Sequence, residues 1–136
     1  MTREEWSKLD LEERRIKVAT LCGWRRTYVY DNTFFGTQVE KWVNTHDDQL
    51  ILFSELPDYL NDLNAMHEAE KLLKYCNDPN CKNDMCGKGT WGMYTRMLDE
   101  IVNENSEKCG SWGVSYCATA SQRAEAFILT MDTEND

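Results

Sequence analysis

The stretch LPDYLNDLNAMHEAE, which runs from Leu56 to Glu70, decides the fold more than any other part of the sequence. Pro57 suits a first helical turn, because its missing N–H would have no partner there in any case. At 100° per residue, the apolar side chains of this stretch and of its continuation fall on one broad face, which we expect to be buried. They are Leu56, Tyr59, Leu60, Leu63, Met66 and Leu73. We therefore predict a helix from about Pro57 to Tyr75.

The N-terminal segment, residues 1–22, has a second helical pattern. Thr2 with Glu5, and Asp10 with Glu13, have the spacing of a capping box, in which the first side chain bonds the backbone three residues later and the acid bonds back. The segment is therefore predicted to be either one helix or two helices that are joined near Asp10.

Two further helices are expected in the second half of the chain. One runs from Thr90 to Asn103 and turns its aromatic and aliphatic side chains inward; these are Trp91, Tyr94, Leu98, Ile101 and Val102. The last helix begins at Thr119, which has capping-box spacing with Gln122. Its apolar stripe consists of Ala120, Ala124, Phe127, Ile128 and Met131. Residues 132–136 are expected to form a frayed tail.

Three short segments are candidates for β-strands. Trp24 to Tyr30 (WRRTYVY) is rich in aromatic and β-branched residues, and Ser111 to Cys117 (SWGVSYC) alternates in polarity. Leu50 to Phe53 (LILF) reads as a short buried strand, whereas VEKWVN is ambiguous. We predict an α+β fold: one domain over residues 1–136, built as a layered sandwich in which a small antiparallel sheet is packed by about four helices.

Length and charge limit the classes of partner. The chain has 136 residues, which fits one domain, and a net charge of −9, which argues against nucleic acid and against an anionic membrane surface. No apolar run is long enough to span a bilayer, and the charged start MTREEWSKLD lacks an apolar signal segment. We therefore expect a protein of a reducing cytoplasm, whose six cysteines are thiols or metal ligands.

Three segments of the chain resemble the phage ABA sandwich domain family. They are LPDYLNDLNAMHEAEKLL (Leu56 to Leu73), ATASQRAEAFILTM (Ala118 to Met131) and the opening EEWSKLDLEERRIKVATLCGW, and they stand in the order that the family has. The resemblance implies a gene of a tailed bacteriophage or prophage and a small antiparallel sheet packed by helices. The family has no established biochemical activity, so the resemblance implies origin and fold and gives no mechanism.

Polar residues on the central predicted helix form the first candidate site. His67 and Glu70 fall inside the apolar arc and are three residues apart, so they could share a metal ion or a proton, whereas Glu68 points elsewhere. The alternative is a buried histidine that bonds a neighbour for structural reasons. Asn61, Asn64 and Glu68 form a polar row, which is either a solvated helix face or a set of groups that bond a ligand or loop backbone.

The cysteine-containing loop, predicted over residues 76–90, is a candidate metal site. Cys76, Cys81 and Cys86 are each separated by four residues, at the edge of the spacing that zinc sites use. A fourth ligand would have to come from Cys109, Cys117 or His46. The alternative is a set of free thiols with no metal cofactor.

Two arginine-bearing segments are candidate anion sites. Gln122 and Arg123 lie at the start of the last predicted helix, where backbone N–H groups attract anions, although capping and a surface salt bridge are the simpler explanation of these residues. Trp24, Arg25 and Arg26 form a locally basic aromatic patch.

The sequence contains no nucleophile elbow, Walker loop or dinucleotide-binding glycine motif, so we do not expect an enzyme. We expect a non-enzymatic phage accessory protein that binds a host or phage protein in the host cytoplasm and modulates host machinery or host defence. One alternative is a binder that sequesters a nucleotide-type small ligand, as a homo-oligomer, with Arg25, Arg26 or Arg123 beside Trp24 or Tyr28. Another is a zinc-binding module built on the cysteine loop.

Overall fold

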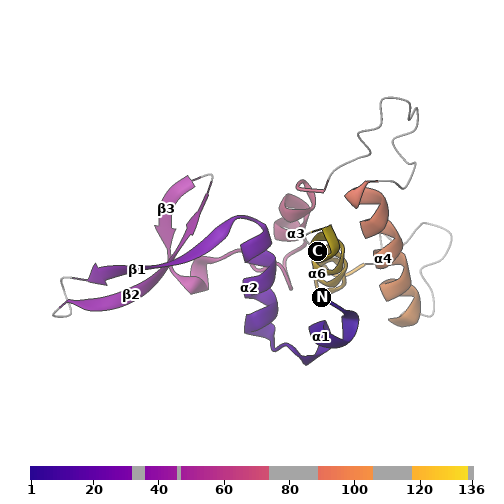
Figure 1. Ribbon diagram of the computed structural model, residues 1–136, viewed down its shortest axis with the longest axis horizontal. Helices are drawn as coiled ribbons and strands as arrows, with labels where there is room; N and C mark the ends of the chain where they lie inside the picture. The colour runs from indigo at the N-terminus through magenta and orange to yellow at the C-terminus, as the bar shows by residue number, and fades with distance from the viewer. Residues whose placement is uncertain (32–35, 46, 74–88, 106–117, 135–136) are drawn as a thin grey trace.

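The computed structural model describes residues 1–31, 36–45, 47–73, 89–105 and 118–134 (Figure 1). Within these ranges it contains five α-helices, one 3-10 turn and a three-stranded antiparallel sheet, so the predicted α+β class is confirmed. The predicted strand Ser111 to Cys117 and nearly all of the cysteine loop lie outside the described residues.

The N-terminal segment forms two helices, α1 (Arg3–Lys8) and α2 (Leu11–Leu21), rather than one. Both predicted capping boxes are present. Thr2 Oγ1 accepts a hydrogen bond from the Glu5 N–H at 3.2 Å, and Asp10 Oδ1 accepts one from the Glu13 N–H at 2.8 Å. Because Asp10 begins a new helix, the chain changes direction between the two.

The sheet consists of β1 (Trp24–Asp31), β2 (Thr37–Asn44) and β3 (Asp47–Ile51), in the order β1-β2-β3. β1 and β2 are paired along their whole length, from Trp24 opposite Asn44 to Asp31 opposite Thr37. Gly36, with φ of 77°, leads into β2 in a backbone conformation that favours glycine. The first strand prediction is thus confirmed, and the ambiguous VEKWVN segment is a strand.

The prediction of a buried strand from Leu50 to Phe53 is wrong in two respects. β3 ends at Ile51, and Phe53–Glu55 form the 3-10 turn η2. Leu50 and Leu52 are 47% and 42% exposed. Leu50 pairs with Val43 and therefore lies on the sheet face opposite to Trp42, which is the residue that the sheet buries.

The predicted helix from Pro57 to Tyr75 is also shorter than expected, because α3 spans only Leu63–Glu70. Before it, Arg15 of α2 donates hydrogen bonds to the carbonyl oxygens of Leu56 and Pro57, and the Pro57 oxygen also accepts from the Tyr59 N–H at 3.1 Å, which is not a helical hydrogen bond. Asp62 then caps α3, with Oδ1 accepting from the Asn64 N–H at 2.9 Å. Leu63 is 44% exposed rather than buried, because the segment before it is not helical.

The core is built around α6 (Ala120–Glu134), which contacts α1, α2, α3 and α4 (Thr90–Asn105) (Figure 1). The predicted capping box is present, because Thr119 Oγ1 accepts from the Gln122 N–H at 3.2 Å and Gln122 Oε1 accepts from the Thr119 N–H at 2.9 Å. α6 continues to Glu134, so it occupies part of the predicted frayed tail.

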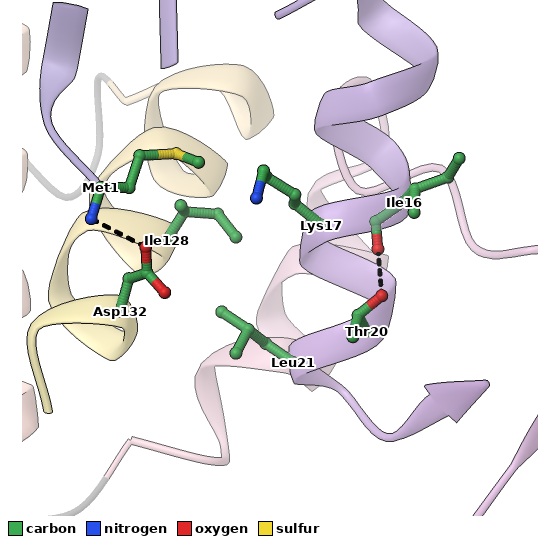
Figure 2. A pocket seen from close by; sticks show the side chains of 7 residues that line it. All are labelled: Met1, Ile16, Lys17, Thr20, Leu21, Ile128 and Asp132. Atoms are coloured by element: carbon green, nitrogen blue, oxygen red, sulfur yellow. Dashed lines mark hydrogen bonds and ion pairs between the residues drawn. The ribbon is translucent and has the colours of Figure 1, made fainter. Parts of the chain in front are cut away.

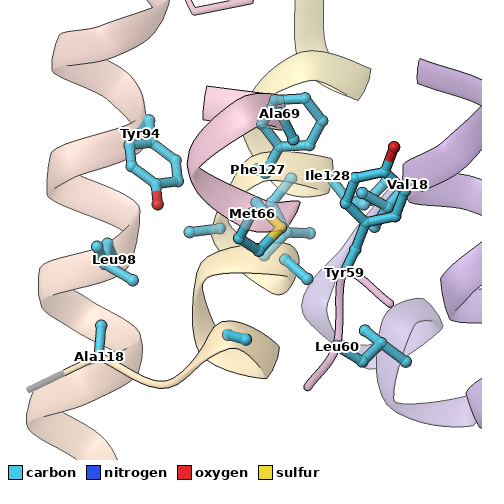
Figure 3. Close-up of a cluster of buried hydrophobic side chains, with 14 of the residues drawn as sticks. Val18, Tyr59, Leu60, Met66, Ala69, Tyr94, Leu98, Ala118, Phe127 and Ile128 are labelled. Atoms are coloured by element: carbon cyan, nitrogen blue, oxygen red, sulfur yellow. The ribbon is translucent and has the colours of Figure 1, made fainter. Parts of the chain in front are cut away.

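Helix α6 is buried on more than one side. The small side chains of Ala120, Ala124 and Ala126 let other elements come close, and Phe127 and Ile128 fill the space between α3, α4 and α2 (Figure 3). The inward residues predicted for the helix at Thr90 are buried with them, except Trp91, which is half-buried. Met131, the last member of the predicted stripe of α6, is also only half-buried.

The sheet lies to one side of the helices, and the β1–β2 hairpin reaches away from them (Figure 1). Trp42 joins the two parts: it is 2% exposed, and its ring centroid is 6.2 Å from that of Phe53. None of the helices in the described ranges is long and apolar enough to cross a membrane.

Candidate functional site

Three buried polar side chains meet where α3, α4 and α6 come together. Tyr94 OH donates a hydrogen bond of 2.5 Å to Glu70 Oε1, and Arg123 Nη1 donates one of 2.8 Å to the same oxygen. The Glu70 and Arg123 side chains are only 7% and 9% exposed. We call Glu70, Tyr94, Arg123 and the adjoining His67 the Glu70 cluster.

His67 occupies the open side of this cluster. Its Nδ1 atom lies 3.1 Å from Glu70 Oε2, as the spacing of three residues predicted, but the His67 side chain is 53% exposed. The alternative of a buried histidine is therefore wrong, and the buried member of the pair is Glu70. The reason is that α3 is short, so that His67 lies at the rim of the core. Glu68 points elsewhere, as predicted, and pairs with Lys71 at 2.6 Å on the exposed face.

The surroundings of the cluster fix the protonation of Tyr94 and Arg123. Burial raises the pKa of Tyr94 well above its usual value, and the hydrogen bond to Glu70 and its negative charge raise it further. Burial disfavours the charged form of Arg123, but the hydrogen bond and the charge of Glu70 outweigh burial and raise the pKa of Arg123. The Glu70 side chain is thus held by a neutral phenol and a charged guanidinium, which suits an internal anchor between three helices.

A cavity of about 360 Å³ opens beside the cluster. Its lining includes His67, Glu70, Lys71, Leu73 and Trp91. The centroid of the Trp91 ring lies 5.6 Å from that of the buried Tyr94 ring. One wall of the cavity is therefore a side chain that packs against the core. An indole surface, an imidazole and a lysine amine together could hold a small planar ligand with a negative charge.

The second cavity, of about 320 Å³, lies between α2 and α6 (Figure 2). Apolar side chains line most of it, and Lys17 extends from α2 toward Ile128 and Met1. The Met1 amino group pairs with Asp132 at 2.8 Å at its edge. The sequence patterns did not indicate this cavity, because its walls are ordinary apolar residues of two helices.

The predicted anion site at the start of the last helix has a different role. Gln122 completes the capping box with Thr119, and Arg123 turns inward, where it donates hydrogen bonds to Glu70 Oε1 at 2.8 Å and to the Ala118 carbonyl oxygen at 3.4 Å. The alternative that we predicted, a helix cap and a salt bridge, describes the arrangement better than an anion site does. The salt bridge is, however, buried and not on the surface. The Arg123 guanidinium is buried with the Glu70 carboxyl group, which lies on α3.

The predicted basic aromatic patch is divided between the two faces of the sheet. Arg26 lies over the Trp42 ring, with 5.4 Å between its guanidinium carbon and the ring centroid, and it pairs with Glu40 at 3.4 Å. Arg25 follows the opposite parity of the strand. Trp24 donates a hydrogen bond of 3.2 Å to Tyr59 OH. The structure therefore does not bring Arg25, Arg26 and Arg123 into one site.

The predicted polar row is exposed and only partly helical. Asn61 precedes α3 and donates hydrogen bonds to the Asp58 carboxylate at 3.0 and 3.2 Å. Asn64 lies in the first turn of the helix, and Glu68 on its exposed side. These three residues form a solvated surface, as the simpler interpretation held.

The candidate zinc ligands Cys76, Cys81 and Cys86 lie outside the described residues, as do Cys109, Cys117 and His46. In the ranges that the structure describes, no group of three or more His, Cys, Asp or Glu side chains is placed to hold a metal ion. Cys22 is described, and burial raises the pKa of its thiol to about 11. A thiol of this kind is a weak nucleophile at neutral pH.

Sequence reasoning identified Glu70 as unusual but missed Tyr94 as its partner. A signal was present, because a tyrosine on the inner stripe of a helix needs a partner for its hydroxyl group. Glu70 and Arg123 are 53 residues apart in the sequence, and the structure brings them together. None of the protein-family models, curated proteins or solved structures with which the chain was compared matches it.

Proposed function

We propose that this chain is a non-enzymatic phage accessory protein that acts in the host cytoplasm by binding another protein. The phage origin rests on the resemblance of the three sequence segments. The binding function rests on one observation: the β1–β2 hairpin reaches away from the helices and carries Tyr28 and Tyr30, which are 56% and 71% exposed (Figure 1).

Both tyrosines lie on the same face of β1, because they are two residues apart. Glu40 and Gln38 stand opposite them on β2, and Arg26 pairs with Glu40 on that face. Aromatic residues beside an arginine, with a polar surrounding, are typical of the central part of protein interfaces. We call the face formed by Arg26, Tyr28, Tyr30, Gln38 and Glu40 the tyrosine face.

A pull-down of the tagged chain from infected host cells, followed by mass spectrometry, tests this proposal. The wild-type chain should capture one stoichiometric partner. The Tyr28→Ala/Tyr30→Ala variant should bind the purified partner at least about tenfold more weakly, because tyrosine is enriched among the few interface residues that each contribute more than about 1 kcal/mol.

Leu11→Ala is the matched control, because Leu11 is 71% exposed but lies on α2. This variant should bind like the wild type. Equal capture by the wild type and the double tyrosine variant, or no stoichiometric partner at all, would contradict the proposal.

A second candidate function is the binding of a nucleotide-type small ligand, and the cavity beside the Glu70 cluster favours it. Trp91 offers a stacking surface for a base, and Lys71 a cation for a phosphate group. If this function holds, adenine or cyclic nucleotides should raise the melting temperature of the wild type but not of the Trp91→Ala variant. Equal melting temperatures of the wild type with and without nucleotide would exclude it.

A further inference from the structure

Strand β1 has one edge that no other strand pairs within the described part of the chain. The sheet order is β1-β2-β3, and every residue of β1 from Trp24 to Asp31 is paired with β2 on the inner side only. The outer edge of a strand presents a row of backbone N–H and C=O groups that can pair with another strand. The hairpin reaches away from the helices, so this edge is accessible over its outer half (Figure 1).

The sequence of β1 is complementary to itself when two copies run antiparallel. If a two-fold axis passes through Tyr28, Arg25 stands opposite Asp31 of the second copy, and Thr27 stands opposite its Val29. Tyr28 then meets Tyr28. Opposite charges, β-branched side chains and aromatic rings are the pairs that stabilise neighbouring antiparallel strands.

Other alignments of the two β1 strands do not give this set of favourable pairs. An axis through Arg25 or Arg26 places like charges directly opposite each other, which destabilises a strand pair. An axis through Thr27 pairs Arg25 with Val29 and leaves Asp31 without a cation opposite. Because side chains alternate along a strand, a shift by one residue changes every pair, and the charges therefore select the axis at Tyr28.

We propose that β1 pairs with β1 of a second copy of this chain, so that two three-stranded sheets form one continuous antiparallel sheet. A two-fold contact uses the same surface on both copies, which fits a strand that is complementary to itself. The pairing also brings the tyrosine faces of both copies together, since directly opposite residues lie on one side of the sheet. This proposal does not depend on the identity of any other partner.

The first test is the mass of the full-length chain in solution, measured by native mass spectrometry and analytical ultracentrifugation at micromolar concentration. The wild type should form a dimer. The Tyr28→Lys variant should raise the dissociation constant by about tenfold or more, because two lysines would then meet at the axis. Leu11→Lys is the control with a similar exposed position on α2 and should stay dimeric.

The second test is a charge reversal that depends on the register. Arg25→Asp and Asp31→Arg should each weaken the dimer, because each places like charges opposite each other, and the double variant should restore it. A wild-type chain that stays monomeric would overturn the proposal, and so would a dimer that the single reversals leave unchanged. A monomer that instead adds an extended peptide of another protein at β1 would also overturn it. Far-UV circular dichroism checks that every variant is folded.

These outcomes differ from those of the pull-down. A monomeric chain that still captures a partner through Tyr28 and Tyr30 would overturn the pairing of β1 and leave the proposed binding function intact. A dimer that captures no partner would overturn the proposed binding function and leave the pairing of β1 intact.

Discussion

The helical body and the β1–β2 hairpin differ in how they treat their polar and aromatic groups. In the body, Glu70 is buried with an arginine and a tyrosine on one oxygen and a histidine on the other. In the hairpin, Tyr28 and Tyr30 are exposed, and the ion pair between Arg26 and Glu40 is open to solvent. The body thus encloses its charged groups among helices, whereas the hairpin leaves its aromatic and charged side chains at the surface, which is the basis of the binding function that we propose for it.

The comparison also explains why the same residue types contribute differently to stability and to binding in the two regions. A buried ion pair is costly to break, since the remaining charge stays in a poorly solvated place, whereas an exposed pair exchanges its partner for water. An exposed tyrosine adds little to stability but offers a large surface to a partner.

Removing one partner of the buried ion pair should have the largest effect. Arg123→Ala leaves the Glu70 carboxylate buried without its guanidinium, and we expect a loss of about 3–5 kcal/mol in the free energy of unfolding. Arg26→Ala, the matched change in the hairpin, should cost at most about 1 kcal/mol. Urea denaturation of both variants measures the difference. Similar losses in the two variants would contradict the contrast between body and hairpin.

Trp42 is the residue whose loss should separate the two regions. It is buried between Phe53 and Arg26, so Trp42→Ala should lower the free energy of opening the sheet by about 3–5 kcal/mol. Hydrogen exchange should show faster exchange in β1 and β2 while α6 keeps its protection. Uniform loss of protection over the whole chain would mean that sheet and body form a single cooperative unit.

The hydroxyl group of Tyr94 should add a pH dependence to stability at alkaline pH. The folded state raises the pKa of Tyr94 above its usual value of 10.0, so it holds this proton more tightly than the unfolded chain. The stabilisation is therefore fully present below pH 10 and is lost as the pH rises from there.

The variant Tyr94→Phe isolates this contribution. It should be less stable by about 1–2 kcal/mol at neutral pH, because the buried Glu70 Oε1 atom loses one of its two hydrogen-bond donors. Its stability should also fall less steeply above pH 10, although Tyr59 and Cys22, whose pKa values burial also raises, keep part of the slope. Urea denaturation at a series of pH values checks both points; parallel pH profiles for wild type and variant would contradict them.

The cap of α3 should have the smallest effect. Asp62→Ala removes the side chain that accepts from the Asn64 N–H, and the cost should be about 1 kcal/mol. Asp62→Asn is the control, since asparagine caps nearly as well and should restore most of the stability. A loss above that of Tyr94→Phe would show that Asp62 does more than cap the helix.

Local signals in the sequence predicted the helix starts well. Thr2, Asp10 and Thr119 each bond a residue three positions away, so their capping boxes depend on nothing else in the chain. The aromatic and β-branched composition of β1 was equally informative.

Contacts between distant residues account for what the sequence patterns missed. The segment from Pro57 to Asp62 is not helical, and its start is bonded by Arg15, which is 42 residues from Pro57 and which no local pattern places there. Glu70 and Arg123 were each candidates, but 53 residues separate them, and no local pattern shows that they meet. Tyr94 was predicted only as a core residue, because the acceptor for its hydroxyl group lies on another helix.

Hydrogen exchange of the chain with and without its captured partner tests the division between body and hairpin most directly. We predict that binding slows exchange in β1 and β2, around Tyr28 and Tyr30, and leaves the amides of α3 and the first turns of α4 unchanged. Slower exchange around His67 and Trp91, with no change in β1 and β2, would contradict this division and place recognition at the cavity beside the Glu70 cluster.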